Sequence, residues 1–84
     1  DLINENPELA NVEIYAYSKT IAIAAGEKVI GKVEVFTISG EQIVSRQVNA
    51  YGEYELNMSA VNPGIYIVRA YVGDAVETAK VILR

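Results

Sequence analysis

The 84-residue chain contains no cysteine and no histidine. Without cysteine it can form neither disulfides nor thiolate metal sites. Without histidine it lacks the commonest general base and a frequent metal ligand, so none of its serine hydroxyls has an imidazole to activate it. These absences predict a domain that is not an enzyme and that binds no cofactor or metal.

Basic residues are also few, with 7 lysines and arginines against 11 acidic residues and a net charge of -4. Nucleic-acid partners require a basic patch, so this balance argues against them. No apolar run approaches the roughly 20 residues that a membrane-spanning helix needs, and no signal peptide is visible. The apolar fraction of 51% predicts a folded domain rather than a disordered chain.

The chain does contain a series of short β-prone runs, and no long stretch has the apolar period of a helix. We predict an all-β domain, a seven-stranded antiparallel immunoglobulin-like β-sandwich formed by residues 12–84. Residues 1–11 are polar and predict a linker or leader. The seven runs are 12–17, 20–25, 32–39, 42–49, 53–58, 64–72 and 75–83.

Turn residues separate these runs. Ser-Gly at 39–40 and Gly-Asp at 73–74 are two-residue hairpin signals, and Ser-Lys at 18–19 separates the first two runs. Longer breaks are expected at the glycine-bounded segment 26–31 and at 49–52. The short spacing between runs favours antiparallel neighbours throughout.

The run 64–72 is the longest β-prone stretch and follows the turn signal Asn-Pro-Gly at 62–64. We expect Gly64 to need a positive φ or a close approach, which only glycine tolerates well. Both faces of this run are largely apolar, which predicts a central strand with neighbours on each side and cover on both faces. One face carries Tyr66, Val68, Ala70 and Val72.

The period of two in a strand also predicts the facing of other side chains. It places Val81 and Leu83 in the core, with Lys80 and Arg84 pointing outward. The facing of Glu34 is ambiguous, because apolar residues lie on both faces of its run. In the run 53–58, the inward residues are Tyr54, Leu56 and Met58, and the outward ones are Glu53, Glu55 and Asn57.

Tyr15 and Tyr17 share one face of the first run, beside Glu13. Exposed tyrosines in a row can form an aromatic platform for a sugar or a partner protein. The alternative is that they cover an edge of the core. No convergent polar group is expected beside them, so we predict no robust glycan affinity for the isolated domain.

Three segments together resemble a known family. Residues 33–44 are similar to a V-x-V-[YF]-x-x-x-G-x-x-[VI] hairpin that includes Gly40, and residues 64–69 to a G-[VI]-Y-[IV]-[VL]-[RK] strand that includes Gly64 and Tyr66. The chain then reaches Lys80-Val81-Ile82-Leu83-Arg84, similar to a terminal K-[VI]-[VI]-[VL]. This order and spacing resembles the C-terminal sorting domain of cargo proteins of the type IX secretion system in Bacteroidetes. The Pro-Asn-Pro motif that often opens the family is present only in part.

The resemblance implies a domain that directs a larger cargo, encoded upstream in the same precursor, across the outer membrane. The partners it implies are the type IX secretion machinery and its sortase-like protease. It also implies transit through the periplasm, followed by release of the cargo at the cell surface or outside the cell. Carried over by position, recognition falls on residues 80–84, with Gly40, Gly64 and Tyr66 as the turn and strand motif.

Two other functions are compatible with the residues themselves. The first is an accessory β-sandwich that presents Tyr15 and Tyr17 to a glycan or a protein, within a secreted multidomain protein. The second is a passive spacer beside a catalytic domain. Position in the precursor distinguishes the sorting domain from the binding module, because a sorting domain must be C-terminal whereas a binding module can lie anywhere.

Overall fold

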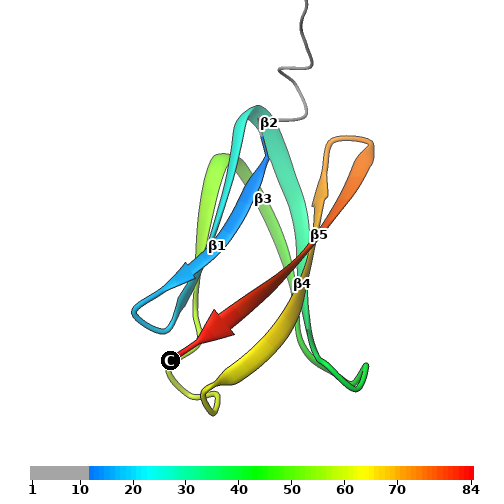
Figure 1. The fold of residues 1–84 in the computed structure, drawn as a ribbon. Coiled ribbons are helices and arrows are strands. Elements are labelled where there is room, and N and C mark those ends of the chain that lie inside the picture. The colour runs from blue at the N-terminus through cyan, green and yellow to red at the C-terminus, as the bar shows by residue number, and fades with distance from the viewer. Residues whose placement is uncertain (1–11) are drawn as a thin grey trace, which may run out of the picture.

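The computed structural model describes residues 12–84, which form five β-strands and no helix (Figure 1). The prediction of an all-β, antiparallel fold is therefore confirmed. The predicted linker or leader, residues 1–11, lies outside the described residues. No membrane-spanning helix occurs among residues 12–84. The strands are β1 (Glu13–Tyr17), β2 (Thr20–Thr37), β3 (Gln42–Asn57), β4 (Gly64–Val72) and β5 (Ala75–Leu83).

The long strand β2 is the centre of the sheet. Its first half pairs with β1 on one side and with the second half of β3 on the other. Its second half pairs with β4 and with the first half of β3, and β5 then pairs with β4. The sheet order is therefore β1-β2-β4-β5, with β3 along the remaining side of β2.

The prediction of seven separate strands is wrong, because two strands continue through segments where breaks were expected. β2 runs through 26–31 and β3 runs through 49–52. Gly26 and Gly52 adopt φ angles of 65° and 88°, and a Cβ on Gly52 would lie only 3.3 Å from the carbonyl oxygen of Gly26. The two strands therefore bend together where these glycines meet, with a register shift, and stay paired on both sides of the bend.

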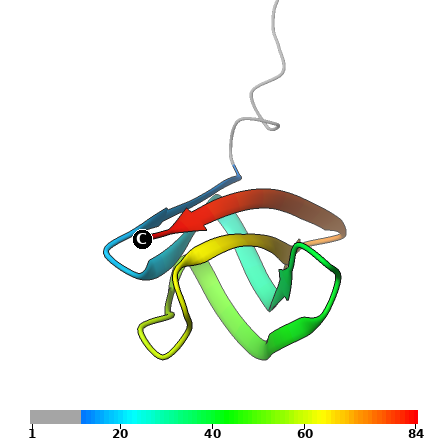
Figure 2. The same ribbon diagram turned by 60° about the horizontal axis from the view of Figure 1, so that its bottom comes forward.

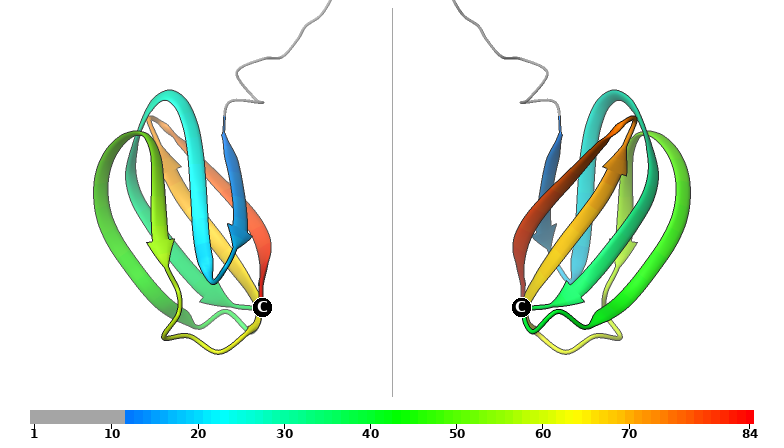
Figure 3. Two further views of the ribbon diagram at one scale, coloured as in Figure 1. Left: turned by 90° about the vertical axis from the view of Figure 1, so that its left-hand side faces the viewer. Right: turned by 90° about the vertical axis from the view of Figure 1, so that its right-hand side faces the viewer.

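The shared bend folds the sheet over its own interior. Figure 3 shows β2 and β3 arching over at the same end of the molecule, and Figure 2 shows the strands curving around one interior. All five strands belong to one hydrogen-bonded sheet. The immunoglobulin-like sandwich therefore stays a prediction.

The short turns lie where the sequence places them. Residues 18–19 join β1 to β2, and residues 73–74 join β4 to β5. The hairpin at 39–40 is also present, although its loop extends over residues 38–41. Within this loop the backbone N–H of Gly40 donates to the carbonyl oxygen of Thr37 at 2.9 Å.

β4 has strands on both sides, as predicted, because β2 and β5 flank it. Its inward residues Tyr66, Val68, Ala70 and Val72 are all buried. The expectation that both its faces are covered is wrong, since Ile65 on the outer face is 43% exposed. Only the inner face of the bent sheet has a second layer of side chains against it.

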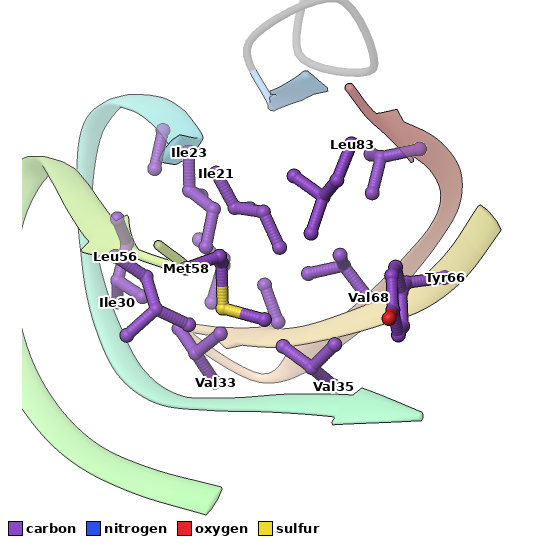
Figure 4. Close-up of a cluster of buried hydrophobic side chains, with 14 residues drawn as sticks. Ile21, Ile23, Ile30, Val33, Val35, Leu56, Met58, Tyr66, Val68 and Leu83 are labelled. Carbon is purple, nitrogen blue, oxygen red and sulfur yellow. The ribbon is translucent and has the colours of Figure 1, made fainter. Parts of the chain in front are cut away.

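The core is formed by the inward residues of β2 to β5 together with Met58, which point into one interior (Figure 4). Ile21 and Ile23 come from the first half of β2, and Val33 and Val35 from its second half. Leu56 and Met58 are buried, and Glu53, Glu55 and Asn57 are exposed, so the predicted facing of run 53–58 is confirmed. Each buried aliphatic side chain contributes roughly 1.5–3 kcal/mol.

Candidate functional site

The segment 80–84 divides its side chains between the two faces of β5. Val81 and Leu83 are only 4% and 3% exposed, which confirms that they belong to the core. Lys80, Ile82 and Arg84 face outward and are exposed. The alternation of a strand thus fixes β5 to the core with two residues and presents the other three to solvent.

The neighbours of this outward row are apolar. The β4–β5 register places Lys80 opposite Ile67 and Ile82 opposite Ile65. Ile65 and Ile82 are 43% and 52% exposed, which is high for isoleucine side chains. The row therefore combines an exposed apolar pair with two positive charges.

β5 also lies beside β1, at the opposite edge of the sheet. The two strands are in contact and run in the same direction (Figure 1), but no strand pairing joins them. A hollow of about 310 Å³ lies between them, lined by residues 14–16 of β1, residues 80–82 of β5 and Arg84. We call this boundary between the two edge strands the β1–β5 seam.

The two cations of the outward row make no ion pair within residues 12–84. Both ion pairs in that range involve Glu34 instead. The side chains of Lys80 and Arg84 are thus exposed positive charges beside an apolar surface.

Tyr15 and Tyr17 face outward on β1 and are 47% and 46% exposed. Their rings stack at a centroid separation of 6.0 Å. Contrary to expectation, a polar group does accompany them, because the Tyr17 hydroxyl donates to Glu55 Oε2 at 2.6 Å. This hydrogen bond raises the pKa of Tyr17, with smaller contributions from burial and from the negative charges nearby. The sequence predicted only that Glu55 faces outward. Its contact with Tyr17 depends on the pairing of β1 and β3 with the first half of β2, which period-two alternation alone does not reveal.

Acidic residues do not assemble a metal site in the part of the chain that the structure describes. No group of three or more aspartate or glutamate side chains lies close enough to hold an ion there. Glu53 and Glu55 are both exposed, as the predicted outward facing requires, and Glu55 accepts the hydrogen bond from Tyr17.

The three motif residues lie in turns and the core. Gly64 begins β4 with a φ of 156°, which confirms the expected positive φ. Tyr66 is buried, and its hydroxyl donates to the carbonyl oxygen of Asn62 at 2.6 Å, so it closes the turn that precedes its own strand. The β4–β5 register sets Gly64 opposite Leu83 and Tyr66 opposite Val81. Gly40 lies apart from them in the β2–β3 loop, with a φ of 102° and open space around it.

Glu34, whose facing the sequence left ambiguous, lies at the centre of a charged cluster on the outer face of the sheet. It faces outward yet is only 6% exposed, because Lys32, Arg69 and Tyr71 surround its carboxylate. Its oxygens lie 3.3 Å from Lys32 Nζ, 3.3 Å from Arg69 Nη1 and 3.0 Å from the Tyr71 hydroxyl. The β2–β4 register places Glu34 opposite Arg69, and this brings the members of the cluster together.

The surroundings of Glu34 set its protonation. Burial alone raises the pKa of the carboxyl, but the Tyr71 hydrogen bond and the positive charges of Lys32 and Arg69 outweigh burial. The pKa of Glu34 therefore lies below its ordinary value. Arg69 also packs against Phe36, with its guanidinium carbon 4.8 Å from the ring centroid.

One known protein family matches nearly the whole chain. The family model described as "Secretion system C-terminal sorting domain" matches residues 6–84, nearly the whole chain. No curated protein matches it. The match confirms the resemblance found in the sequence, and domains of this kind are sorting signals for type IX secretion rather than catalysts. The chain therefore belongs to the family of secretion system C-terminal sorting domains.

Proposed function

We propose that the outward row of β5, made of Lys80, Ile82 and Arg84, is the surface that the type IX secretion machinery recognises. The observation that carries this proposal is the division of residues 80–84 into two buried side chains and three exposed ones. A positive, apolar surface without ion pairs among residues 12–84 offers a partner both charge and area to bury. Val81 and Leu83 hold this surface in place.

In this proposal the domain acts at the end of a larger precursor. The cargo crosses the periplasm, passes the outer membrane and stays at the cell surface or leaves the cell, and a sortase-like protease removes the domain. The family assignment supports this sequence of events. The proposal assigns no catalytic step to the chain itself, because domains of its family are sorting signals. The bent sheet with its single core is compatible with the immunoglobulin-like sandwich. No observation favours the accessory binding module.

The test is export of a periplasmic reporter that carries this chain at its C-terminus, in a host with a type IX system. The wild-type fusion should reach the cell surface. The double variant Lys80→Ala with Arg84→Ala should stay in the periplasm, although the isolated variant domain should melt like the wild type, because both side chains are exposed.

The matched control removes two other exposed cations, Lys19→Ala with Arg46→Ala. It makes the same change in net charge on other parts of the surface and should leave export intact. Equal export of both double variants would show that the outward row of β5 is only a solvated strand face. A wild-type fusion that never leaves the periplasm would contradict the sorting role itself.

A further inference from the structure

The β1–β5 seam joins two edges that have no strand partner on their facing sides in the part of the chain that the structure describes. There β1 pairs with β2 alone, and β5 with β4 alone. Among residues 12–84 no backbone hydrogen bond connects β1 with β5, although they lie side by side. Because the two edges are in contact, an added segment lies over the β1–β5 seam rather than between the strands.

The walls of the seam combine two kinds of chemistry. Tyr15 on one side and Ile82 on the other are about half exposed and line the hollow of about 310 Å³. Lys80 and Arg84 line the same hollow and have no ion pair within the described residues. An occupant that fits must therefore carry an apolar side chain for the hollow and negative charges for its rim.

The spacing along β5 sets the spacing in the occupant. Lys80 and Ile82 stand on the same face of β5, and Arg84, which directly follows the strand, lines the same hollow. In extended chain, residues four apart are separated by about 13 Å, and side chains on one face recur every second residue. A segment that lies along β5 meets these three side chains with the pattern acidic-x-apolar-x-acidic.

We propose that the β1–β5 seam binds an extended segment of a partner protein with this pattern. Its apolar side chain enters the hollow between Tyr15 and Ile82, and its two carboxylates pair with Lys80 and Arg84. The proposal rests on the proposed recognition role of the outward row of β5, because it states the chemistry of the partner at that surface.

The first experiment titrates the isotope-labelled 84-residue chain with blocked synthetic peptides and follows its amide resonances. The probe is Ser-Glu-Thr-Leu-Thr-Glu-Ser. One matched peptide replaces both Glu by Lys, and another replaces Leu by Ser. At millimolar concentration the probe should shift the amides of residues 14–16 and 80–84, and the two matched peptides should bind at least several-fold more weakly. Added salt should weaken binding of the probe, because the charges are exposed.

The second experiment reverses the charges of the seam. Lys80→Glu with Arg84→Glu should invert the preference, so that the lysine peptide binds better than the probe by roughly tenfold, as expected for two exposed ion pairs exchanged for two repulsions. Lys19→Glu with Arg46→Glu is the matched control and should keep the original preference. Inversion requires a folded domain, so a variant that merely unfolds cannot mimic it.

Several results of these titrations would overturn the proposal. They are no amide shift at millimolar probe, equal binding of the lysine peptide, loss of all binding without inversion in the folded reversed variant, and shifts confined to residues outside the seam. Concentration-dependent shifts of the seam amides without peptide would also overturn it, and would assign the seam to a second copy of this chain.

The peptide titrations and the export assay fail independently. Export that survives Lys80→Ala with Arg84→Ala, together with specific peptide binding, would leave the seam as a binding site and remove its role in sorting. Loss of export in that variant without peptide binding by the wild type would keep the recognition surface and reject the acidic partner segment.

Discussion

Two charged groups lie on the outer face of the same sheet, and they differ in whether the fold satisfies them. In the Glu34 cluster on β2 and β4, two cations and a hydroxyl balance the carboxylate, and Glu34 itself is only 6% exposed. The outward row of β5 has two cations and an exposed isoleucine with no ion pair among residues 12–84. Charges that the fold neutralises serve stability, whereas charges left exposed beside apolar surface are available to a partner.

The largest effect on stability is expected in the core beneath the outward row, because truncation there should destabilise the sheet that carries both charged groups. Leu83→Ala should lower the free energy of unfolding by about 2–4 kcal/mol, because Leu83 is 3% exposed. The control Ile82→Ala, one residue away but 52% exposed, should change it by about 0.5 kcal/mol or less. Denaturant titration measures both, and equal losses would show that β5 does not alternate between core and solvent.

Glu34→Gln should break the neutralised cluster, with a loss of stability that is smaller than that of Leu83→Ala. The amide keeps the shape of the side chain but leaves Lys32 and Arg69 without their counter-charge. The matched control is Glu53→Gln, which removes an exposed carboxylate and should leave the melting temperature unchanged. Equal melting of both variants would show that the Glu34 cluster does not stabilise the fold.

The stability that the Glu34 cluster provides should also depend on pH. The pKa of Glu34 is lowered in the folded state, so its contribution is complete above the unfolded value of about 4.3 and is lost as the pH falls through the lowered folded pKa. The wild type should therefore lose more stability below about pH 4.3 than Glu34→Gln does. Parallel pH profiles of the two proteins would contradict this assignment.

The smallest effect concerns a third outward contact, between Tyr17 and Glu55. The carboxylate accepts a hydrogen bond from the Tyr17 hydroxyl, which raises the pKa of Tyr17 above its ordinary value of 10.0. Stability from this bond is complete below pH 10.0 and is lost as the pH rises through the raised pKa. Glu55→Gln should lower the pKa of Tyr17 towards its ordinary value, as followed by ultraviolet absorbance. An unchanged transition would show that the hydrogen bond does not set the pKa.

Local pattern predicted the parts of the fold that depend on neighbours in sequence. The alternation in β5, the run 53–58 and the tight turns at 18–19 and 73–74 follow from spacing and turn chemistry alone. The outward residues of segment 80–84 could be identified in the same way. The family resemblance came from short motifs in order, and the family match confirms it.

What local pattern could not give is pairing between distant residues. Gly26 and Gly52 each resemble a turn, and only their contact across β2 and β3 turns two expected breaks into one shared bend. Glu34 meets Arg69 only through the β2–β4 register. The β1–β5 seam likewise exists because the bend brings the two edges of the sheet together, which no single run encodes.

The shared bend also has a kinetic consequence. Since β2 and β3 remain one hairpin, three of the four ladders in the sheet join strands that are consecutive in the chain. Only the β2–β4 ladder, with Val35 opposite Val68, must close a long loop. That ladder should set the refolding rate, so Val35→Ala or Val68→Ala should slow refolding, whereas changes in β1 should mainly speed unfolding. Stopped-flow refolding and unfolding rates of these variants test this prediction. In the expected folding order, the separate hairpins form first and join into one sheet when β4 pairs with β2.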